Sequence, residues 1–339
     1  TSLPMLNLLT LLVLLPAFVQ ATTDQCRTLV AKMPQMMTLH APYTPFQRDD
    51  ARSLNATADN IHNLAAQAAA HGVTTIFVPG SMSQFETLTL PERKTLMTNW
   101  VTAGHAHNLY VILHVGTSVQ GDAIALAKFA DSLGADAIGS VPMYYESSSD
   151  VTTIVDFLQP IAAAAPTLPM FYYHLPQVTH ADILVSDLLD LAATRIPTLC
   201  GVKWVGTSLA DWFKMVNKYN TSRALLFAPE PKLASFSLGM GRGVVLAEDF
   251  YAGTYLRMHN AWLNGDTSTA IAEQAWKYTS EAVFNRYAGT PKRRCYERFN
   301  LTRLDMGDGR LPQMCFDPSM QDKLFEELDG IGFWEKSQL

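Results

Sequence analysis

Short apolar runs alternate with helical segments along most of the chain, and this alternation is the feature that most constrains the fold. The runs expected to form strands lie at residues 36–41, 73–79, 109–116, 135–142, 168–175, 201–205, 224–228 and 243–247. The segments expected to form helices lie near residues 57–71, 91–106, 119–133, 149–164, 181–195, 207–219 and 231–240. Strands and helices in this number, without a Pro- or Gly-rich linker, are typical of one α/β domain, the (β/α)8 TIM barrel. We expect the barrel, with extra C-terminal helices, to span residues 34–290.

Two neighbouring runs each carry a reactive polar residue. The run at 168–176 presents Tyr173, and the run at 200–205 presents Lys203. The segment between them, 182–196, has the apolar spacing of a helix, so the unit is interpreted as strand, helix, strand. Strands joined in this way lie parallel, and their carboxyl ends share one edge of the sheet. We therefore expect Tyr173 and Lys203 to lie close together near this edge of the sheet.

Lys203 lies inside a short apolar, β-branched strand. Side chains of this kind disfavour the ammonium charge, which lowers the pKa of the lysine and frees its amine to attack a carbonyl. The alternative is a lysine on the solvated side of an edge strand, or one that extends from a strand end into water. Lys203 is thus a candidate Schiff-base nucleophile.

The sequence Tyr-Tyr-His-Leu-Pro at 172–176, followed by Gly-Val-Lys at 201–203, resembles the pyruvate-dependent class I aldolase family. Within that family it resembles the N-acetylneuraminate lyases more than the dihydrodipicolinate synthases. Further matching segments lie at 76–80, 88–93, 111–116 and 157–169, and the resemblance extends from about Pro34 to Ala288. It implies a carbon–carbon lyase that cleaves N-acetylneuraminate to N-acetylmannosamine and pyruvate. It also implies a small-molecule 2-keto acid substrate, a homotetramer, and no metal or organic cofactor.

The resemblance also implies roles for individual residues. Lys203 would form an imine with the C2 ketone of the keto acid, and Tyr173 would take the proton of the C4 hydroxyl. Ser81 and Met82 lie in the loop after the second strand, which holds the substrate carboxylate in the family. Tyr144 matches an aromatic position at the end of the fourth strand.

Departures from the family pattern gather where the family binds the rest of the sugar acid. Met82 and Gln84 replace a hydroxyl residue and a Glu of the carboxylate loop. The remaining positions expected to contact the substrate are Val205, Ala228, Glu230, Pro231 and Leu246, and at most of them a family hydroxyl or acid is missing. A buried substrate hydroxyl left unpaired costs roughly 1–3 kcal/mol. A lyase for a different 2-keto acid and a secreted, catalytically impaired pseudoenzyme are therefore alternatives.

The chain starts with an apolar stretch, residues 1–21, which ends in Val-Gln-Ala. This pattern predicts a secretory signal peptide, and hence a secreted or lumenal protein. A membrane anchor is the alternative, but Pro16 and the short length disfavour stable insertion. Glycosylation triplets at Asn55, Asn220 and Asn300 agree with secretion. Without a true leader the chain would be cytoplasmic, as is usual for the family.

The four cysteines form two candidate pairs. Cys295 and Cys315 lie in the tail at 291–339, which we expect to be irregular, and a disulfide there would staple a segment with little core of its own. Cys26 and Cys200 could form a second bridge, although free thiols are equally consistent with the sequence.

Charge and ligand spacing exclude two classes of partner. The net charge of −6 gives no basic field, so nucleic acid is not an expected ligand. The sequence also shows no His and Cys cluster with the spacing of metal ligands, and no metal site is predicted.

Overall fold

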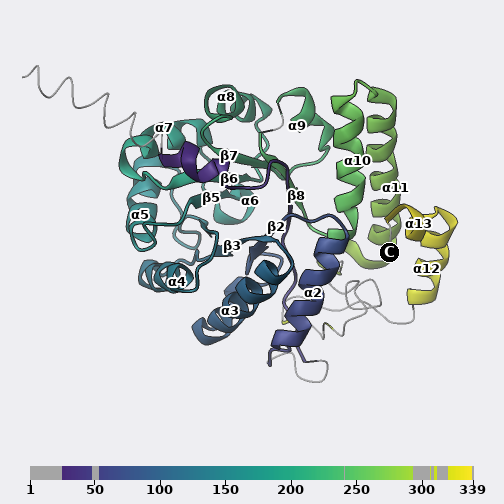
Figure 1. The fold of residues 1–339 in the computed structure, drawn as a ribbon, viewed down its shortest axis with the longest axis horizontal. Coiled ribbons are helices and arrows are strands. Elements are labelled where there is room, and N and C mark those ends of the chain that lie inside the picture. The colour runs from purple at the N-terminus through teal and green to yellow at the C-terminus, as the bar shows by residue number, and fades with distance from the viewer. Residues whose placement is uncertain are drawn as a thin grey trace, which may run out of the picture.

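The computed structural model describes residues 25–47, 53–239, 241–292, 306, 309–310 and 320–337. Parallel strands close into one barrel in chain order, from β1 to β8 (Figure 1). The strands are β1 Met37–His40, β2 Thr75–Val78, β3 Tyr110–His114, β4 Ala137–Ser140, β5 Met170–His174, β6 Leu199–Trp204, β7 Ala224–Phe227 and β8 Gly243–Leu246. Each lies within or overlaps an expected run, so the predicted (β/α)8 barrel is confirmed.

Helices follow the strands and surround the barrel. They are α2 Ala58–Ala70, α3 Leu90–Ala106, α4 Gln120–Ser132, α5 Val151–Ala163, α7 Val185–Arg195, α8 Leu209–Tyr219 and α9 Leu233–Ser237. Short turns are added by η1 Phe85–Thr87, α6 Pro176–Thr179 and η2 Asp249–Tyr251. Helix α3 begins at a capping box, in which Thr89 and Glu92 bond to each other's backbone N–H groups and so satisfy two donors that the first turn leaves free.

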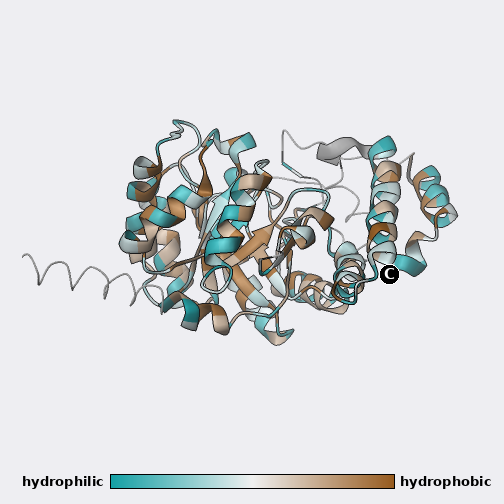
Figure 2. Ribbon diagram, turned by 90° about the horizontal axis from the view of Figure 1, so that it is seen from above, coloured by the Kyte–Doolittle hydropathy of each residue, from teal (hydrophilic) through white to brown (hydrophobic). Residues whose placement is uncertain are grey.

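The strands are largely apolar because both of their faces are buried. On β6, Val202 and Trp204 pack outward in the layer between the sheet and the helices. The alternate position, Lys203, points into the barrel, where its amine lies near the ring of Phe77. Figure 2 shows the result, with hydrophobic strands at the centre and hydrophilic residues on the outer helix faces. One polar residue of β6 is thus forced into an apolar interior.

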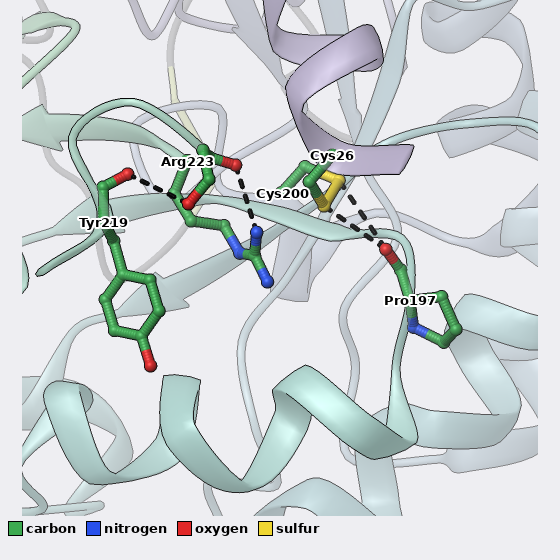
Figure 3. Close-up of a disulfide and its surroundings, with 6 residues drawn as sticks. Cys26, Pro197, Cys200, Tyr219 and Arg223 are labelled. Atoms are coloured by element: carbon green, nitrogen blue, oxygen red, sulfur yellow. Dashed lines mark hydrogen bonds between the residues drawn. A yellow bond between two sulfur atoms is a disulfide. The ribbon is translucent and has the colours of Figure 1, made fainter. Parts of the chain in front are cut away.

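The amino-terminal segment closes the bottom of the barrel. A short helix at residues 25–31 is joined to the start of β6 by a disulfide between Cys26 and Cys200 (Figure 3). Val30 and Met33 pack with the residues inside the barrel. Arg242 donates hydrogen bonds to the carbonyl oxygens of both residues. Of the two states considered for Cys26 and Cys200, the bridge is confirmed.

The C-terminal helices are α10 Ala252–Leu263, α11 Thr267–Lys292, α12 Gln321–Gly330 and α13 Phe333–Ser337. Figure 1 shows α10 and α11 side by side next to the barrel, with α12 and α13 beyond them. The expectation of an irregular tail is therefore wrong for α12 and α13. The physical reason is an aromatic cluster, because the buried ring of Phe333 stacks on Trp276 and meets Phe284 edge to face.

Several predictions fall on residues that the structure does not describe. The leader at 1–21, the triplet at Asn300 and the pair Cys295 and Cys315 lie outside the described residues. Asn220 is exposed directly after α8, whereas Asn55 is half-buried. In the described ranges, none of the helices combines the length and apolarity needed to cross a membrane.

Candidate active site

A cavity of about 340 Å³ opens at the carboxyl ends of the strands, where barrel enzymes place their chemistry. Strand ends supply one part of its wall, and the helices α10 and α11 supply another. The lining residues are Ala41, Ser81, Met82, Tyr173, Leu175, Val178, Lys203, Val205, Ala228, Glu230, Lys232, Val245, Leu246, Ala247, Glu248, Tyr251, Tyr255, Lys277 and Glu281.

Lys203 and Tyr173 are direct neighbours in the parallel pairing of β5 with β6. The Lys203 side chain is buried, and its Nζ lies 3.7 Å from the ring centroid of Tyr173 and 4.4 Å from that of Phe77. Burial lowers the pKa of Lys203 below its ordinary value, and the favourable interaction with Tyr173 opposes this shift. The expected pairing of a lysine with lowered pKa and a tyrosine at one mouth is therefore present.

A hydroxyl and a buried histidine surround Tyr173. Its phenol oxygen lies 3.4 Å from Oγ of Ser81. The ring of His114, at the end of β3, stands nearly perpendicular to the Tyr173 ring, with 5.9 Å between centroids. Burial, with the charges of Arg93 and Lys203, keeps the pKa of His114 well below its ordinary value, so the imidazole is neutral. His114 is not among the predicted site residues, although it lies within one of the segments that match the family.

The loop after β2 lines the cavity with Ser81 and Met82. Amides further along the turn are used internally, because the N–H of Ser83 bonds to the carbonyl of Gly80 and that of Gln84 to the carbonyl of Ser81. In the part of the chain that the structure describes, the N–H groups of Ser81 and Met82 have no hydrogen-bond partner. Adjacent free amides of this kind suit an anion such as a carboxylate.

Gln84, which stands where the family has Glu, holds this loop to the C-terminal part of the chain. Its Nε2 donates to the carbonyl oxygen of Arg310 over 2.7 Å, and its Oε1 accepts from the N–H of Arg310 over 3.2 Å. The guanidinium of Arg310 in turn bonds to Glu92 and to the carbonyl of Thr87. An amide side chain offers both the donor and the acceptor that this contact uses, whereas the ionised carboxylate of a Glu offers acceptors alone.

The middle of the cavity is apolar. Val205 follows β6, Ala228 follows β7, and Leu246 ends β8. Val245 and Ala247 lie on either side of Leu246 and line the same region. No hydroxyl side chain stands among these five residues, so the predicted loss of polar contacts in this region agrees with the structure.

The far end of the cavity is a cluster of paired charges around Glu230. Its Oε1 accepts from the hydroxyl of Tyr255 over 2.7 Å and lies 3.0 Å from Nζ of Lys277 and 3.2 Å from Nζ of Lys232. Its Oε2 accepts from the amide of Gln274 over 3.2 Å. Burial alone would raise the pKa of Glu230, but the two lysine charges and the Tyr255 hydroxyl outweigh it and lower the pKa to about 2.

Both lysines of this cluster have several partners. Lys277, on α11, also pairs with Glu281 one turn further along the helix. Lys232 is buried and donates to the carbonyl oxygens of Ala228 and Pro229. Sequence reasoning missed Lys232, Tyr255 and Lys277. The position of Lys232 at the end of the loop after the seventh strand was a usable signal. In contrast, no local sequence pattern predicts that residues of α10 and α11 lie at the barrel mouth.

The structure brings most of the predicted site residues together. Those that line the cavity are Ser81, Met82, Tyr173, Lys203, Val205, Ala228, Glu230 and Leu246. Tyr144 and Pro231 do not line it. Tyr144 packs edge to face against Phe85, with 6.1 Å between ring centroids, and Pro231 is exposed beside Glu230. Across the described ranges, no three His, Cys, Asp or Glu side chains are grouped so that they could hold a metal ion.

Comparison with curated proteins finds relatives at about one third identity. The N-acetylneuraminate lyases of Mus musculus and Homo sapiens are each 33% identical over 205 residues, which is 60% of this chain and 64% of each relative. That of Pongo abelii is 30% identical over 236 residues, 69% of this chain and 73% of the relative. The chain thus spans about 64% of the length of the mouse and human relatives.

Comparison with solved structures finds the same fold. The N-acetylneuraminate lyase of Proteus mirabilis superposes with a TM-score of 0.80 at 23% identity, covering 88% of this chain and 99% of that one. A dihydrodipicolinate synthase from Cyanidioschyzon merolae gives 0.76 at 22% identity, with 89% and 99% covered. The sequence model of the dihydrodipicolinate synthetase family matches residues 35–323. A match over so much of the chain, on this barrel, shows that the protein belongs to the dihydrodipicolinate synthetase family.

Proposed function

We propose that this chain is a carbon–carbon lyase that forms a Schiff base between Lys203 and a 2-keto acid. The observation that carries the proposal is the buried Lys203 amine, 3.7 Å from the Tyr173 ring in an apolar barrel mouth. Desolvation lowers the pKa of the amine, so a larger fraction is unprotonated and nucleophilic than for an ordinary lysine.

The steps follow from the positions of the lining residues. The N–H groups of Ser81 and Met82 bind the keto acid carboxylate, which sets the C2 carbonyl before the Lys203 amine. The amine adds to C2, water leaves, and the protonated imine becomes the electron sink. Tyr173, as the phenolate left after its proton has gone to the hydroxyl that departs from C2 as water, accepts the proton of the C4 hydroxyl, the C3–C4 bond breaks, and an aldehyde leaves. Protonation of the enamine at C3 and hydrolysis of the imine release pyruvate and the free lysine.

N-acetylneuraminate is the first substrate to consider, because it appears in the names of the mammalian relatives. Its cleavage would give N-acetylmannosamine and pyruvate. A second candidate is a different aldol of pyruvate, and the apolar positions Val205, Ala228 and Leu246 favour it. A binding protein without catalysis is the remaining alternative, and the experiment below separates it from both lyases.

The test is trapping of the imine. The purified protein is incubated with pyruvate and borohydride, and its intact mass is measured. We expect a mass increase equal to one reduced pyruvate adduct in the wild type and in Lys214→Ala, which removes an exposed lysine. We expect no adduct in Lys203→Ala, whose folding is checked by circular dichroism. A folded wild type that forms no adduct would overturn the lyase proposal.

Secretion and assembly remain predictions that accompany this function. Disulfides persist mainly in oxidising compartments, so the bridge between Cys26 and Cys200 supports passage through the secretory pathway. The homotetramer rests on the family resemblance alone, and light scattering of the purified chain would test it.

A further inference from the structure

We propose that the aldehyde released by this enzyme carries an apolar aliphatic or aromatic substituent, where a sialic acid carries a polyol. The proposal rests on the Schiff-base function proposed above and assigns the substrate class of the same site. It starts from the order of groups along the cavity. With the carboxylate at Ser81 and Met82 and C2 at Lys203, the rest of the substrate would extend along the residues at the carboxyl ends of β6, β7 and β8, which line the same cavity.

Five of the side chains that line that region, at the ends of β6, β7 and β8, offer no hydrogen bonds. Val205, Leu246 and Ala228 face it from three successive strand ends, joined by Val245 and Ala247. A polyol placed here would exchange bonds to water for contacts with methyl groups, at roughly 1–3 kcal/mol for each unpaired hydroxyl. An apolar group of the same size gains about 25 cal/mol for each Å² that it removes from water. The wall therefore favours the apolar group.

The charged cluster beyond the wall does not replace the missing polar contacts. Oε1 of Glu230 already has three donors around it, from Tyr255, Lys277 and Lys232. Oε2 accepts from Gln274 and from the backbone N–H of Lys232. A carboxylate has about four acceptor sites in all, so Glu230 has none left for a substrate hydroxyl. Glu230 is consequently a structural group, and not the substrate contact that its position in the sequence suggests.

The opening of the cavity continues the apolar surface. Leu175 precedes α6, and Val178 on α6 is 55% exposed while it lines the cavity. Leu175, Val178 and Val205 thus add three apolar side chains to the lining of the cavity.

The direct test is the reverse, carbon-bond-forming reaction. The wild-type protein is supplied with pyruvate and, in separate reactions, benzaldehyde, isobutyraldehyde or N-acetylmannosamine, and the aldol products are measured by mass spectrometry. We expect kcat/KM for the better apolar aldehyde to exceed that for N-acetylmannosamine at least tenfold. A preference for N-acetylmannosamine would overturn the inference. Imine trapping with pyruvate but no turnover of either apolar aldehyde would also overturn it and leave the Schiff-base function standing, whereas absent trapping would refute that function itself.

Variants of the wall give a second, independent readout. Val205→Thr combined with Leu246→Ser restores hydroxyls at two positions with little change in volume at the first. We expect the ratio of kcat/KM for N-acetylmannosamine to that for benzaldehyde to rise about tenfold or more. The control, Val119→Ser, alters an exposed valine before α4 and should leave the ratio unchanged. An unchanged ratio in a double variant that still traps pyruvate would contradict the proposal.

Discussion

Both ends of the cavity contain ionisable side chains, but only those at the far end are paired with opposite charges. At the inner end, the Lys203 amine lies against aromatic rings, and Tyr173 has the hydroxyl of Ser81 as a neighbour at 3.4 Å. At the far end, Glu230 and Lys277 belong to a network in which each charge meets an opposite charge. Burial without an opposite charge changes the chemistry of a group, whereas burial within a saturated network fixes its position.

This difference has an energetic consequence. A buried amine beside aromatic rings costs folding free energy, and the cost is retained only where reactivity requires it. A carboxylate paired with two lysines and a tyrosine holds its charge, and removal of one partner leaves the other charges without a counterion. The inner end is therefore expected to govern the reaction, and the far end the stability of the barrel mouth.

The largest effect is expected for Tyr173→Phe, which removes the group that accepts the C4 hydroxyl proton. Loss of a general acid–base residue lowers turnover by about 10²–10⁴. We expect this loss in aldol formation from pyruvate and the preferred aldehyde, with borohydride trapping of pyruvate retained. The pair of assays separates carbon-bond chemistry from imine formation.

The neighbouring Tyr172 provides the control. It is fully buried on the outward face of β5, and its hydroxyl has no partner in the described part of the chain. Tyr172→Phe should leave turnover within about threefold of the wild type, since it removes only an unsatisfied polar atom. Equal losses of turnover in both variants would show that Tyr173 acts through packing. The inner end of the cavity would then be structural, as the far end is.

The next largest effect is a loss of stability when the charged cluster at the far end of the cavity is disrupted. Glu230→Gln keeps the shape of the side chain but leaves the charges of Lys232 and Lys277 without their shared partner. Breaking a buried pair in this way costs about 3–5 kcal/mol, and the 26% exposure of the Glu230 side chain places the expected loss near the lower limit. Denaturant unfolding at pH 7 measures it, and pyruvate trapping should persist at native conditions.

The same variant has a defined pH dependence. The pKa of Glu230 falls from 4.5 to about 2 on folding, so its contribution is complete above pH 4.5 and is lost as the pH falls toward 2. The stability difference between wild type and Glu230→Gln should narrow across this interval. Glu86→Gln, at an exposed position, serves as the control and should show no such trend. A constant difference from pH 7 to pH 2 would contradict the role of the charge.

The inner end was largely predictable from local pattern, for a physical reason. Parallel pairing of two adjacent strands follows from the strand, helix, strand spacing, and it places Tyr173 opposite Lys203 without any further information. The apolar replacements at Val205 and Leu246 could also be seen directly in the sequence. Each of these features depends on residues that lie within one strand or at its end.

The far end could not be predicted in the same way. Lys277 and Tyr255 come from helices whose docking on the barrel mouth depends on tertiary packing, which no local period encodes. The same limitation explains α13, because Phe333 is buried against rings supplied by other parts of the chain, Trp276 among them. The sequence does not show that Lys277 and Tyr255 surround Glu230. From the sequence alone, a Glu230 that contacts the substrate therefore could not be distinguished from one whose acceptor sites are all used within the protein.

The smallest expected effect is a gain in the free energy of unfolding, in contrast to the loss expected for Glu230→Gln. The pKa of Lys203 is lower in the folded chain than its ordinary value of 10.5, so the unfolded chain binds the proton more tightly and the ammonium costs stability at neutral pH. Lys203→Met removes the charge at similar volume, and we expect it to stabilise the fold at pH 7 by about 0.5–2 kcal/mol while it abolishes trapping. The gain should shrink as the pH rises toward 10.5, where the wild-type lysine is neutral as well. Lys214→Met, at an exposed position, should remain near the wild type at every pH. A Lys203→Met protein less stable than the wild type at pH 7 would show that Lys203 is a structural partner like Glu230, and the two ends of the cavity would no longer differ.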